Sequence, residues 1–163
     1  LRTLPVEEIE PYVKEELEKA GIWNPKFENE HHDWFLATVD LIRSRFNFTT
    51  DFVTLGRAYF SDDYDTDPKA LKKNIIKHEG LKKWFSILAD RFQALETFSE
   101  ETTEDVIRQL AEEFEIKAGI LINGIRTTVT GQAVGPGIFD VLIAIGQDRV
   151  VERTRKAVGL FDS

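Results

Sequence analysis

The feature that most constrains this chain is a helical spacing of apolar residues along most of its length. From Pro5 to Ala20, apolar residues recur at steps of three and four and form one stripe of an amphipathic helix. Inward-facing apolar residues predict further helices over residues 28–46, 80–97 and 99–114. Capping residues before 51–60 and a proline at the first position of 68–75 predict two more, and a last helix is expected over 148–158. No segment shows the alternation of apolar and polar residues that is typical of a half-buried strand. The sequence therefore predicts an all-α fold.

A glycine-rich stretch from Lys117 to Arg149 interrupts this regular pattern. It holds six of the ten glycines, and short apolar runs lie between them. Gly131 can end one helix and Pro136 can begin the next, because glycine suits the position after a helix and proline suits the first helical turn. The stretch thus predicts two short helices joined by a tight loop, with Arg126 on the helix that leads into it.

Length leaves the number of domains open, since 163 residues can form one core or two small helical subdomains. Aromatic-rich helices give way to shorter, glycine-punctuated segments near residues 98–103. We therefore place a boundary there and predict two subdomains, of residues 1–98 and 99–163. Because the chain begins at Leu1 and runs straight into a helical pattern, we also expect it to be part of a longer protein.

The charge of the chain is unevenly distributed. The formal net charge is −8, which disfavours a nucleic-acid partner, because such binding depends on contacts from Lys and Arg to phosphates. Residues 1–116, however, carry 15 basic and 25 acidic side chains, whereas residues 117–163 carry 6 and 4. The glycine-rich end is therefore the less repulsive one for a polyanion.

Composition also narrows the cellular setting. The chain has no cysteine, which excludes a disulfide framework, a thiolate zinc site and a catalytic thiol, and which is typical of a cytosolic protein. No apolar run approaches the roughly 20 residues that span a bilayer, and no secretory signal opens the sequence. We expect a cytoplasmic protein without a membrane partner.

Few residues suggest catalysis or a metal site. His31 and His32 are adjacent, so on a helix they point about 100° apart and do not readily share a metal ion. The acidic loop over residues 61–67 lacks the glycine and the glutamate of a calcium-binding loop. The glycine loop lacks the preceding strand and the Lys-Ser/Thr pair of a phosphate-binding loop. We predict no catalytic residue and no metal ligand, and we assign three tryptophans to helix contacts or the core: Trp23, Trp34 and Trp84.

Arginines are the more informative residues. Arg43 and Arg45 stand at the end of the helix predicted over residues 28–46, and Arg126 precedes the glycine loop. Two interpretations are open: these side chains cap helices and form surface ion pairs, or their guanidinium groups bind phosphates or base edges. The last helix adds a candidate phosphate-facing stripe, which consists of Arg149, Arg153, Arg155 and Lys156.

Three segments of the sequence resemble bacterial glutamyl-tRNA synthetases. The longest is IRTTVTGQAVGPGIFDVLIAIGQDRVVERTRKAV, which is similar to the family's T-G segment, its G-P-G turn and its L-G-x-x-R helix. Upstream, IRSRFNFTTDF resembles the family's arginine-bearing helix end, and YFSDDYDTDPKALKK resembles the segment that follows it. The resemblance covers essentially the whole chain in order, and the motif from Thr130 to Phe139 is its most specific part.

The resemblance implies an all-helical anticodon-binding region, in which two subdomains pack end to end as a helical cage. In the family this region is attached to a class I catalytic core that uses ATP and magnesium to join glutamate to its tRNA. The signatures that hold ATP in that core are missing here, so the chain is expected to have no cofactor or catalysis of its own. The position of Arg45 faces the third anticodon base in the family. Arg126, Gly135, Pro136 and Ile138 match positions near the first two bases, and Gly135 is expected to act through its backbone.

The chemistry of cytosine agrees with the role that the resemblance implies for Arg45. Cytosine, the third anticodon base of glutamate tRNA, offers acceptors at N3 and O2, and an arginine supplies donors to both. Guanine, which glutamine tRNA has there, presents donors at N1 and N2 instead. We therefore expect Arg45, with Arg43 beside it, to contact the anticodon loop of glutamate tRNA.

The partners expected from this interpretation are glutamate tRNA and the catalytic domain of the longer parent polypeptide. The protein is expected to be a monomer that binds no DNA and no membrane. Two alternatives remain at this stage. One is a helical protein-interaction module whose apolar groove takes a partner helix. The other is a small stand-alone enzyme, which is disfavoured because no pairing of a nucleophile with a base is visible.

Overall fold

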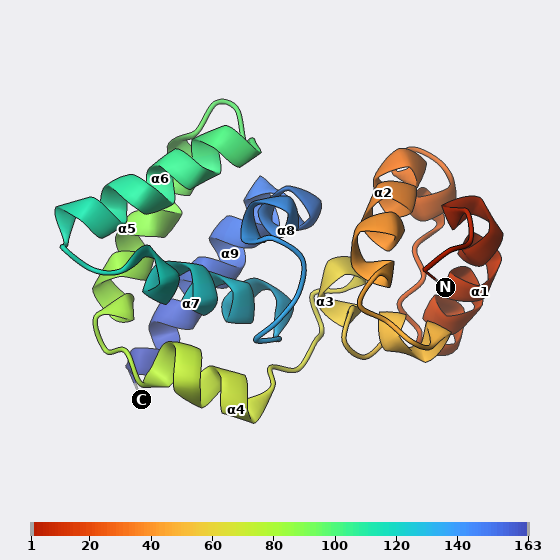
Figure 1. The fold of residues 1–163 in the computed structure, drawn as a ribbon, viewed down its shortest axis with the longest axis horizontal. Coiled ribbons are helices and arrows are strands. Elements are labelled where there is room, and N and C mark those ends of the chain that lie inside the picture. The colour runs from red at the N-terminus through yellow and green to blue at the C-terminus, as the bar shows by residue number, and fades with distance from the viewer. Residues whose placement is uncertain (1, 163) are drawn as a thin grey trace. The chain divides into compact units, whose positions relative to one another are not determined.

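The computed structural model describes residues 2–162 of the chain. All regular secondary structure in this range is helical, which confirms the predicted all-α fold (Figure 1). Contacts within the chain divide it into two compact units, Leu1–Tyr64 and Asp65–Ser163. The boundary predicted after residue 98 falls inside the second unit, because α5 (Leu81–Ala94) and α6 (Glu100–Glu113) pack against each other there.

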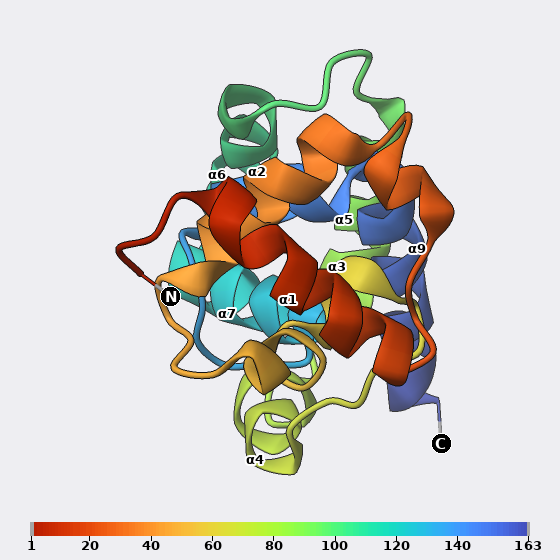
Figure 2. The same ribbon diagram turned by 90° about the vertical axis from the view of Figure 1, so that its right-hand side faces the viewer.

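The first unit holds α1 (Val6–Lys19), a 3-10 turn η1 (Pro25–Glu28), α2 (His32–Arg43), a second 3-10 turn η2 (Thr49–Phe52) and α3 (Arg57–Phe60). The apolar stripe predicted for the first helix is confirmed, since Ile9, Val13 and Leu17 are buried on one face of α1. That face packs against α2 and η2, and Figure 2 shows α1 and α2 side by side.

The second helix is shorter than the range of 28–46 that the sequence predicts. Asn24 caps the separate turn η1, because its Oδ1 accepts a hydrogen bond from the Lys26 N–H at 3.0 Å. The helix therefore begins only at His32. It also ends at Arg43, so that Arg45 lies in the turn that follows the helix rather than within it.

The helix predicted over residues 51–60 is interrupted between η2 and α3. Gly56 lies in this interruption and faces the core closely. A Cβ atom at Gly56 would lie 3.1 Å from the ring of Phe46 and 3.2 Å from the side chain of Ile42. A side chain at this position would be tight against the core, so glycine allows the close approach at the turn between η2 and α3.

Aromatic rings form the core of the first unit. Phe27 and Phe35 stack with their centroids 5.2 Å apart, and Trp23 meets Phe35 edge-on at 5.5 Å. Trp34 lies against Phe27 at 5.6 Å. Offset and edge-to-face pairs of this kind stabilise beyond their buried area. Both tryptophans are half-buried and lie against the buried rings of Phe27 and Phe35, which agrees with their predicted role in helix contacts or the core.

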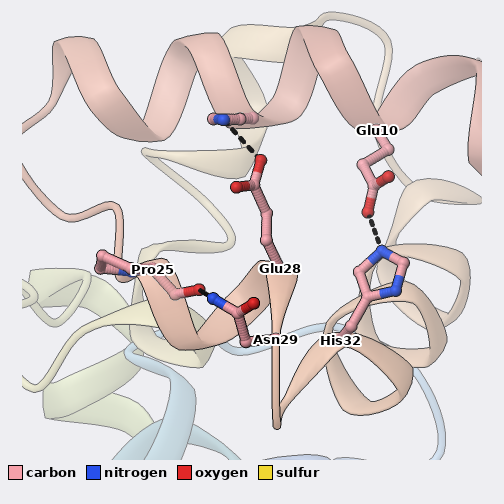
Figure 3. A network of polar contacts seen from close by, with 6 residues as sticks. Glu10, Pro25, Glu28, Asn29 and His32 are labelled. Carbon is pink, nitrogen blue, oxygen red and sulfur yellow. Dashed lines mark hydrogen bonds and ion pairs between the residues drawn. The ribbon is translucent and has the colours of Figure 1, made fainter.

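Polar contacts tie α1 to the segments that follow it (Figure 3). The carboxylate of Glu10 lies 2.6 Å from Nε2 of His32 at the start of α2, and Lys14 pairs with Glu28 at the end of η1. Hydrogen bonding to the Glu28 carboxylate raises the pKa of Lys14. One member of the histidine pair is thus bound to a carboxylate of a neighbouring helix, whereas His31 is exposed.

The second unit holds α4 (Pro68–Leu71), a π-helical turn η3 (Lys72–Ile76), α5, α6, α7 (Ala118–Thr130), α8 (Ile138–Ile145), α9 (Gln147–Val158) and a 3-10 turn η4 (Gly159–Phe161). α5 and α9 form the most extensive helix contact of this unit. They run in opposite directions, because Lys82 near the start of α5 pairs with Asp162 beyond the end of α9. The side-chain amide of Gln147, at the start of α9, donates to the carbonyls of Phe92 and Leu95 at the end of α5, both at 2.9 Å.

Residues 2–162 lack two features, a membrane-spanning helix and a cluster of metal ligands. No helix in that range is both long and apolar enough to cross a membrane. The described part of the chain also contains no group of three or more His, Asp or Glu side chains that could hold a metal ion.

Candidate functional site

The predicted glycine loop joins α7 to α8 (Figure 1). α7 ends at Thr130, and Gly131 follows it with φ of 77°, a left-handed conformation that favours glycine. α8 begins at Ile138 with Gly137 as its N-cap, so Pro136 lies just before the helix rather than in its first turn. The loop and both flanking helices are therefore confirmed, with this shift in the place of the proline.

Hydrogen bonds fix the loop to the helix that precedes it. The guanidinium of Arg126 donates to the carbonyl of Pro136. The hydroxyl of Thr130 donates to the carbonyl of Arg126 at 2.7 Å and accepts from the N–H of Gln132 at 3.1 Å. The N–H of Asp67, from the segment before α4, donates to the carbonyl of Gly131 at 2.8 Å. The loop is therefore held in one conformation by the protein itself.

Val134 in the loop and Ile138 at the start of α8 differ in exposure, which indicates which of them a ligand can contact. Val134 is 75% exposed at the loop tip, whereas Ile138 is 5% exposed and packs into the core. Between them, Gly135 and Pro136 are half-buried. A Cβ atom at Gly135 would lie 3.5 Å from Nη1 of Arg126, so a side chain there would stand against the guanidinium. A ligand at this loop thus meets backbone groups and Arg126, but not the side chain of Ile138.

Arg153 supports the loop from α9 and does not face solvent. It is 6% exposed, and its Nη1 donates to the carbonyl of Val129 in the last turn of α7 at 2.7 Å. A cation suits this place, because the last carbonyls of a helix lack partners and carry partial negative charge. The predicted phosphate contact does not fit this burial. Arg153 instead stabilises the helix end from which the loop starts.

The other cations of the last helix differ in how the protein engages them. Nε of Arg149 donates to the carbonyl of Ile145 at 2.8 Å. Arg155 binds two side chains of α5, Asp90 at 2.9 Å and Gln93 at 2.6 Å. Lys156 is exposed and forms no ion pair with any residue from 2 to 162. Of the predicted phosphate stripe, Lys156 is thus the cation that is most available to a ligand.

A pair of carboxylates lies at the start of α8. Asp140 is in the first turn of this helix, and Glu100 is in the first turn of α6. A hydrogen bond with Asp140 and the negative charge of its carboxylate raise the pKa of Glu100. This acidic pair disfavours a phosphate at the N-terminus of α8, which agrees with the lack of phosphate-loop residues in the sequence.

The two predicted arginines of the first unit have different surroundings. Arg43 donates to the carbonyl of Leu4 and pairs with Asp40 at 2.7 Å, so it holds the N-terminal segment against α2. Arg45 is exposed in the turn after α2, and its side chain makes no hydrogen bond or ion pair with residues 2–162. Arg45 is thus the one of the pair that is available to a ligand.

An exposed aromatic ring lies close to Arg45 in sequence, and the sequence analysis missed it. Phe48 is 68% exposed in the loop between α2 and η2. The carboxylate of Asp51 fixes this loop, because it accepts from the N–H groups of Asn47 and Phe48 at 3.0 and 3.1 Å. The missed signal was an aromatic residue flanked by polar ones, in a segment without helical periodicity.

The anticodon binding domain family matches residues 6–158, which is nearly the whole chain. The chain belongs to this family. Relatives of this anticodon binding domain are glutamate–tRNA ligases. The chain is 49% identical to one from Desulfotalea psychrophila over 161 residues, which cover 99% of the chain and 33% of the relative. It is 36% identical to glutamate–tRNA ligase 2 of Koribacter versatilis over 157 residues, which cover 96% and 32%.

Solved structures agree on the fold of the anticodon binding domain. A glutamate tRNA ligase from Elizabethkingia meningosepticum, crystallised in complex with its amino acid, matches 96% of the chain with a TM-score of 0.77 at 23% identity. The match covers 29% of that protein. The chain therefore spans about a third of the length of the curated relatives it matches, and it corresponds to their anticodon-binding part.

Proposed function

We propose that this chain recognises the anticodon of glutamate tRNA as the anticodon-binding region of a glutamate–tRNA ligase. The observation that carries the proposal is the contrast between Arg45 and its neighbour Arg43. Arg43 is held by the protein, whereas Arg45 is exposed and makes no side-chain bond within residues 2–162. An exposed arginine without a side-chain partner, such as Arg45, can bind a planar ligand that offers two adjacent hydrogen-bond acceptors.

The ligand chemistry that suits Arg45 is the edge of an unpaired cytosine. Sequence-specific RNA recognition targets single-stranded loops, whose bases are splayed out and read on their Watson–Crick edges. Adjacent N–H donors of the guanidinium match N3 and O2 of cytosine, and they oppose the donors of guanine. The exposed ring of Phe48, three residues further on, offers an apolar face on which a base can stack.

The glycine loop suits the other anticodon bases. Its backbone groups are accessible where Gly135 carries no side chain, and Arg126 holds the carbonyl of Pro136 in place. Since these groups are ordered before a ligand arrives, binding does not have to include the cost of ordering the loop. Lys156 on α9 is the remaining candidate for a phosphate contact.

Other parts of the parent protein complete the proposed activity. The ligation of glutamate to tRNA, with ATP and magnesium, belongs to a catalytic domain in the same polypeptide. This chain supplies none of the catalytic residues and acts as a monomer in the cytoplasm. Within this proposal, the chain selects glutamate tRNA by its anticodon.

The test is a titration of the chain with anticodon stem-loops that carry cytosine or guanine as the third anticodon base. Arg45→Ala should reduce the preference for cytosine by about 1–3 kcal/mol, which is the discrimination of a good bidentate contact. Arg108→Ala is the matched control, because Arg108 is exposed on α6 and its ion pair, with Glu104 at 3.0 Å, lies within the same helix. Equal loss of affinity for both stem-loops in the Arg45 variant would show that Arg45 does not read this base.

A further inference from the structure

A basic pocket lies in the second unit, at the end of α7 opposite to the glycine loop. Its volume is about 280 Å³, and its polar lining comes from η3, from the turn after η3 and from the start of α7. The helix rise separates the two ends of the 13-residue α7 by about 20 Å, so this pocket is distinct from the site described above. The polar lining residues are Lys73, Asn74, Lys77, His78, Lys117 and Asn123.

The charge of this pocket is opposite to that of the chain. The chain has a net charge of −8, yet three lysines and no carboxylate line the pocket. The lysines are Lys73, Lys77 and Lys117, and none of them forms an ion pair with any residue from 2 to 162. Three neighbouring cations repel one another, and a bound anion would remove that repulsion.

Packing between η3 and α7 fixes the backbone segment that carries Lys73 and Lys77. The N–H of Lys77 donates to the carbonyl of Lys72 at 3.0 Å, the five-residue spacing of a π turn. The buried amide of Asn74 donates to the hydroxyl of Thr127 on α7 at 3.1 Å. Gly124 makes this close approach feasible, since a Cβ there would lie 3.3 Å from the Asn74 carbonyl. The pocket is therefore built between two fixed helical segments.

The start of α7 adds backbone donors to this lysine cluster. No side chain caps α7, whose N-cap is Lys117. The N–H of Ile120 donates to the carbonyl of Lys117 at 3.0 Å, so the backbone donors open to a ligand are those of Ala118 and Gly119. A Cβ atom built at Gly119 would meet no neighbouring atom within 4 Å. Unpaired N–H groups at a helix start attract anions, and the nearby ammonium groups act in the same direction. The volume lies just below the range of about 300–1,000 Å³ for pockets that bind organic ligands, so the ligand should be small.

We propose that this pocket binds a phosphate group. The group can belong to a nucleic-acid backbone or to a free phosphorylated small molecule, because lysines and helix-start amides recognise the phosphate in both. Binding of a free phosphate to this pocket needs no RNA, so it can be tested independently of anticodon recognition.

The first arm is an NMR titration of the ¹⁵N-labelled chain with inorganic phosphate and then with pyrophosphate. Either anion should shift the amide signals of Ala118 and Gly119 at the start of α7. The triple variant Lys73→Gln/Lys77→Gln/Lys117→Gln should remove these shifts. Its matched control changes the same number of charges at exposed lysines that do not line the pocket: Lys26→Gln/Lys69→Gln/Lys72→Gln.

The second arm measures tRNA affinity of both triple variants over a range of salt concentrations. If the pocket holds backbone phosphates, the pocket variant should bind every tRNA less tightly, whatever its anticodon. The slope of log affinity against log salt should fall by about 0.7–0.9 for each phosphate contact that is lost. Anticodon preference should stay unchanged, which separates this result from a failure of the role assigned to Arg45.

The outcomes of the two arms distinguish the source of the phosphate. A weakened, less salt-dependent binding of tRNA in the pocket variant alone assigns the site to a nucleic-acid backbone. Lysine-dependent amide shifts with unchanged tRNA binding assign it to a free phosphorylated small molecule. The proposal is overturned if neither anion shifts the amides and the two triple variants bind tRNA alike.

Discussion

Replacing Arg153 with methionine tests whether this residue stabilises the fold or contacts RNA phosphates. Methionine keeps an unbranched apolar side chain, so most of the packing around the arginine stem is retained. The substitution removes the hydrogen bond from the guanidinium to the carbonyl of Val129 and leaves that carbonyl without its charged donor. It also removes a cation from the C-terminal end of α7, where cations are stabilising.

The expected loss of stability follows from these contacts. A hydrogen bond to a charged group contributes about 1.5–3 kcal/mol, and an apolar replacement recovers part of the cost of burying the guanidinium. We therefore expect Arg153→Met to lower the free energy of unfolding by about 1–3 kcal/mol. For a chain of this length, each kcal/mol corresponds to a decrease in Tm of about 2–4 °C.

The assay is urea denaturation followed by far-ultraviolet circular dichroism, with Lys156→Met as the matched control. Lys156 lies on the same helix but is exposed, so its replacement should change the free energy of unfolding by less than about 0.5 kcal/mol. Equal stabilities of the two variants would refute the capping role of Arg153. In a tRNA titration, the folded Arg153 variant should keep the wild-type salt dependence, whereas loss of a phosphate contact would reduce the slope by about 0.7–0.9.

Two further predictions concern a pair of glycines and an ion pair. Gly124→Ala and Gly119→Ala both replace a glycine of α7 with a better helix former. At Gly124 the new Cβ would lie 3.0 Å from the Phe85 ring, whereas at Gly119 it would meet no atom within 4 Å. Thermal unfolding should therefore find Gly124→Ala less stable than Gly119→Ala by about 1–3 kcal/mol. Hydrogen bonding to Arg91 lowers the pKa of Glu113. This pair therefore stabilises the fold above the ordinary pKa of glutamate and ceases to do so as the pH falls through the lowered value. In Arg91→Gln, an NMR titration should find the pKa of Glu113 raised toward its ordinary value, and an unchanged pKa would contradict the assignment.

Local sequence signals were sufficient for most of the helices and for the glycine loop. The apolar stripe of α1 depends on residues within a few turns of one another, and Ser99 caps α6 through a hydrogen bond from the N–H of Thr102 at 3.1 Å. Gly131 ends α7 because its left-handed backbone conformation is a local property of glycine. Interactions over short sequence distances are encoded in the residue types themselves.

The ends of the helices in the first unit were less predictable, because distant contacts decide them. The helix predicted over residues 51–60 is broken where Gly56 packs against Phe46, a contact that no propensity describes. The division into units also differs from the predicted boundary, since the change in composition near residue 98 falls within a core that α5, α6 and α9 share.

What the sequence alone determined is the helical class, the loop between α7 and α8, and the set of arginines that could bind a ligand. Only the tertiary structure decided which of those arginines are available. Arg43 bonds to a carbonyl 39 positions away, Arg153 to one 24 positions away and Arg155 to a carboxylate 65 positions away, whereas Arg45 has no such partner within residues 2–162. The physical reason is that a guanidinium bonds to whichever acceptor the fold brings within about 3 Å, and sequence spacing does not specify that acceptor.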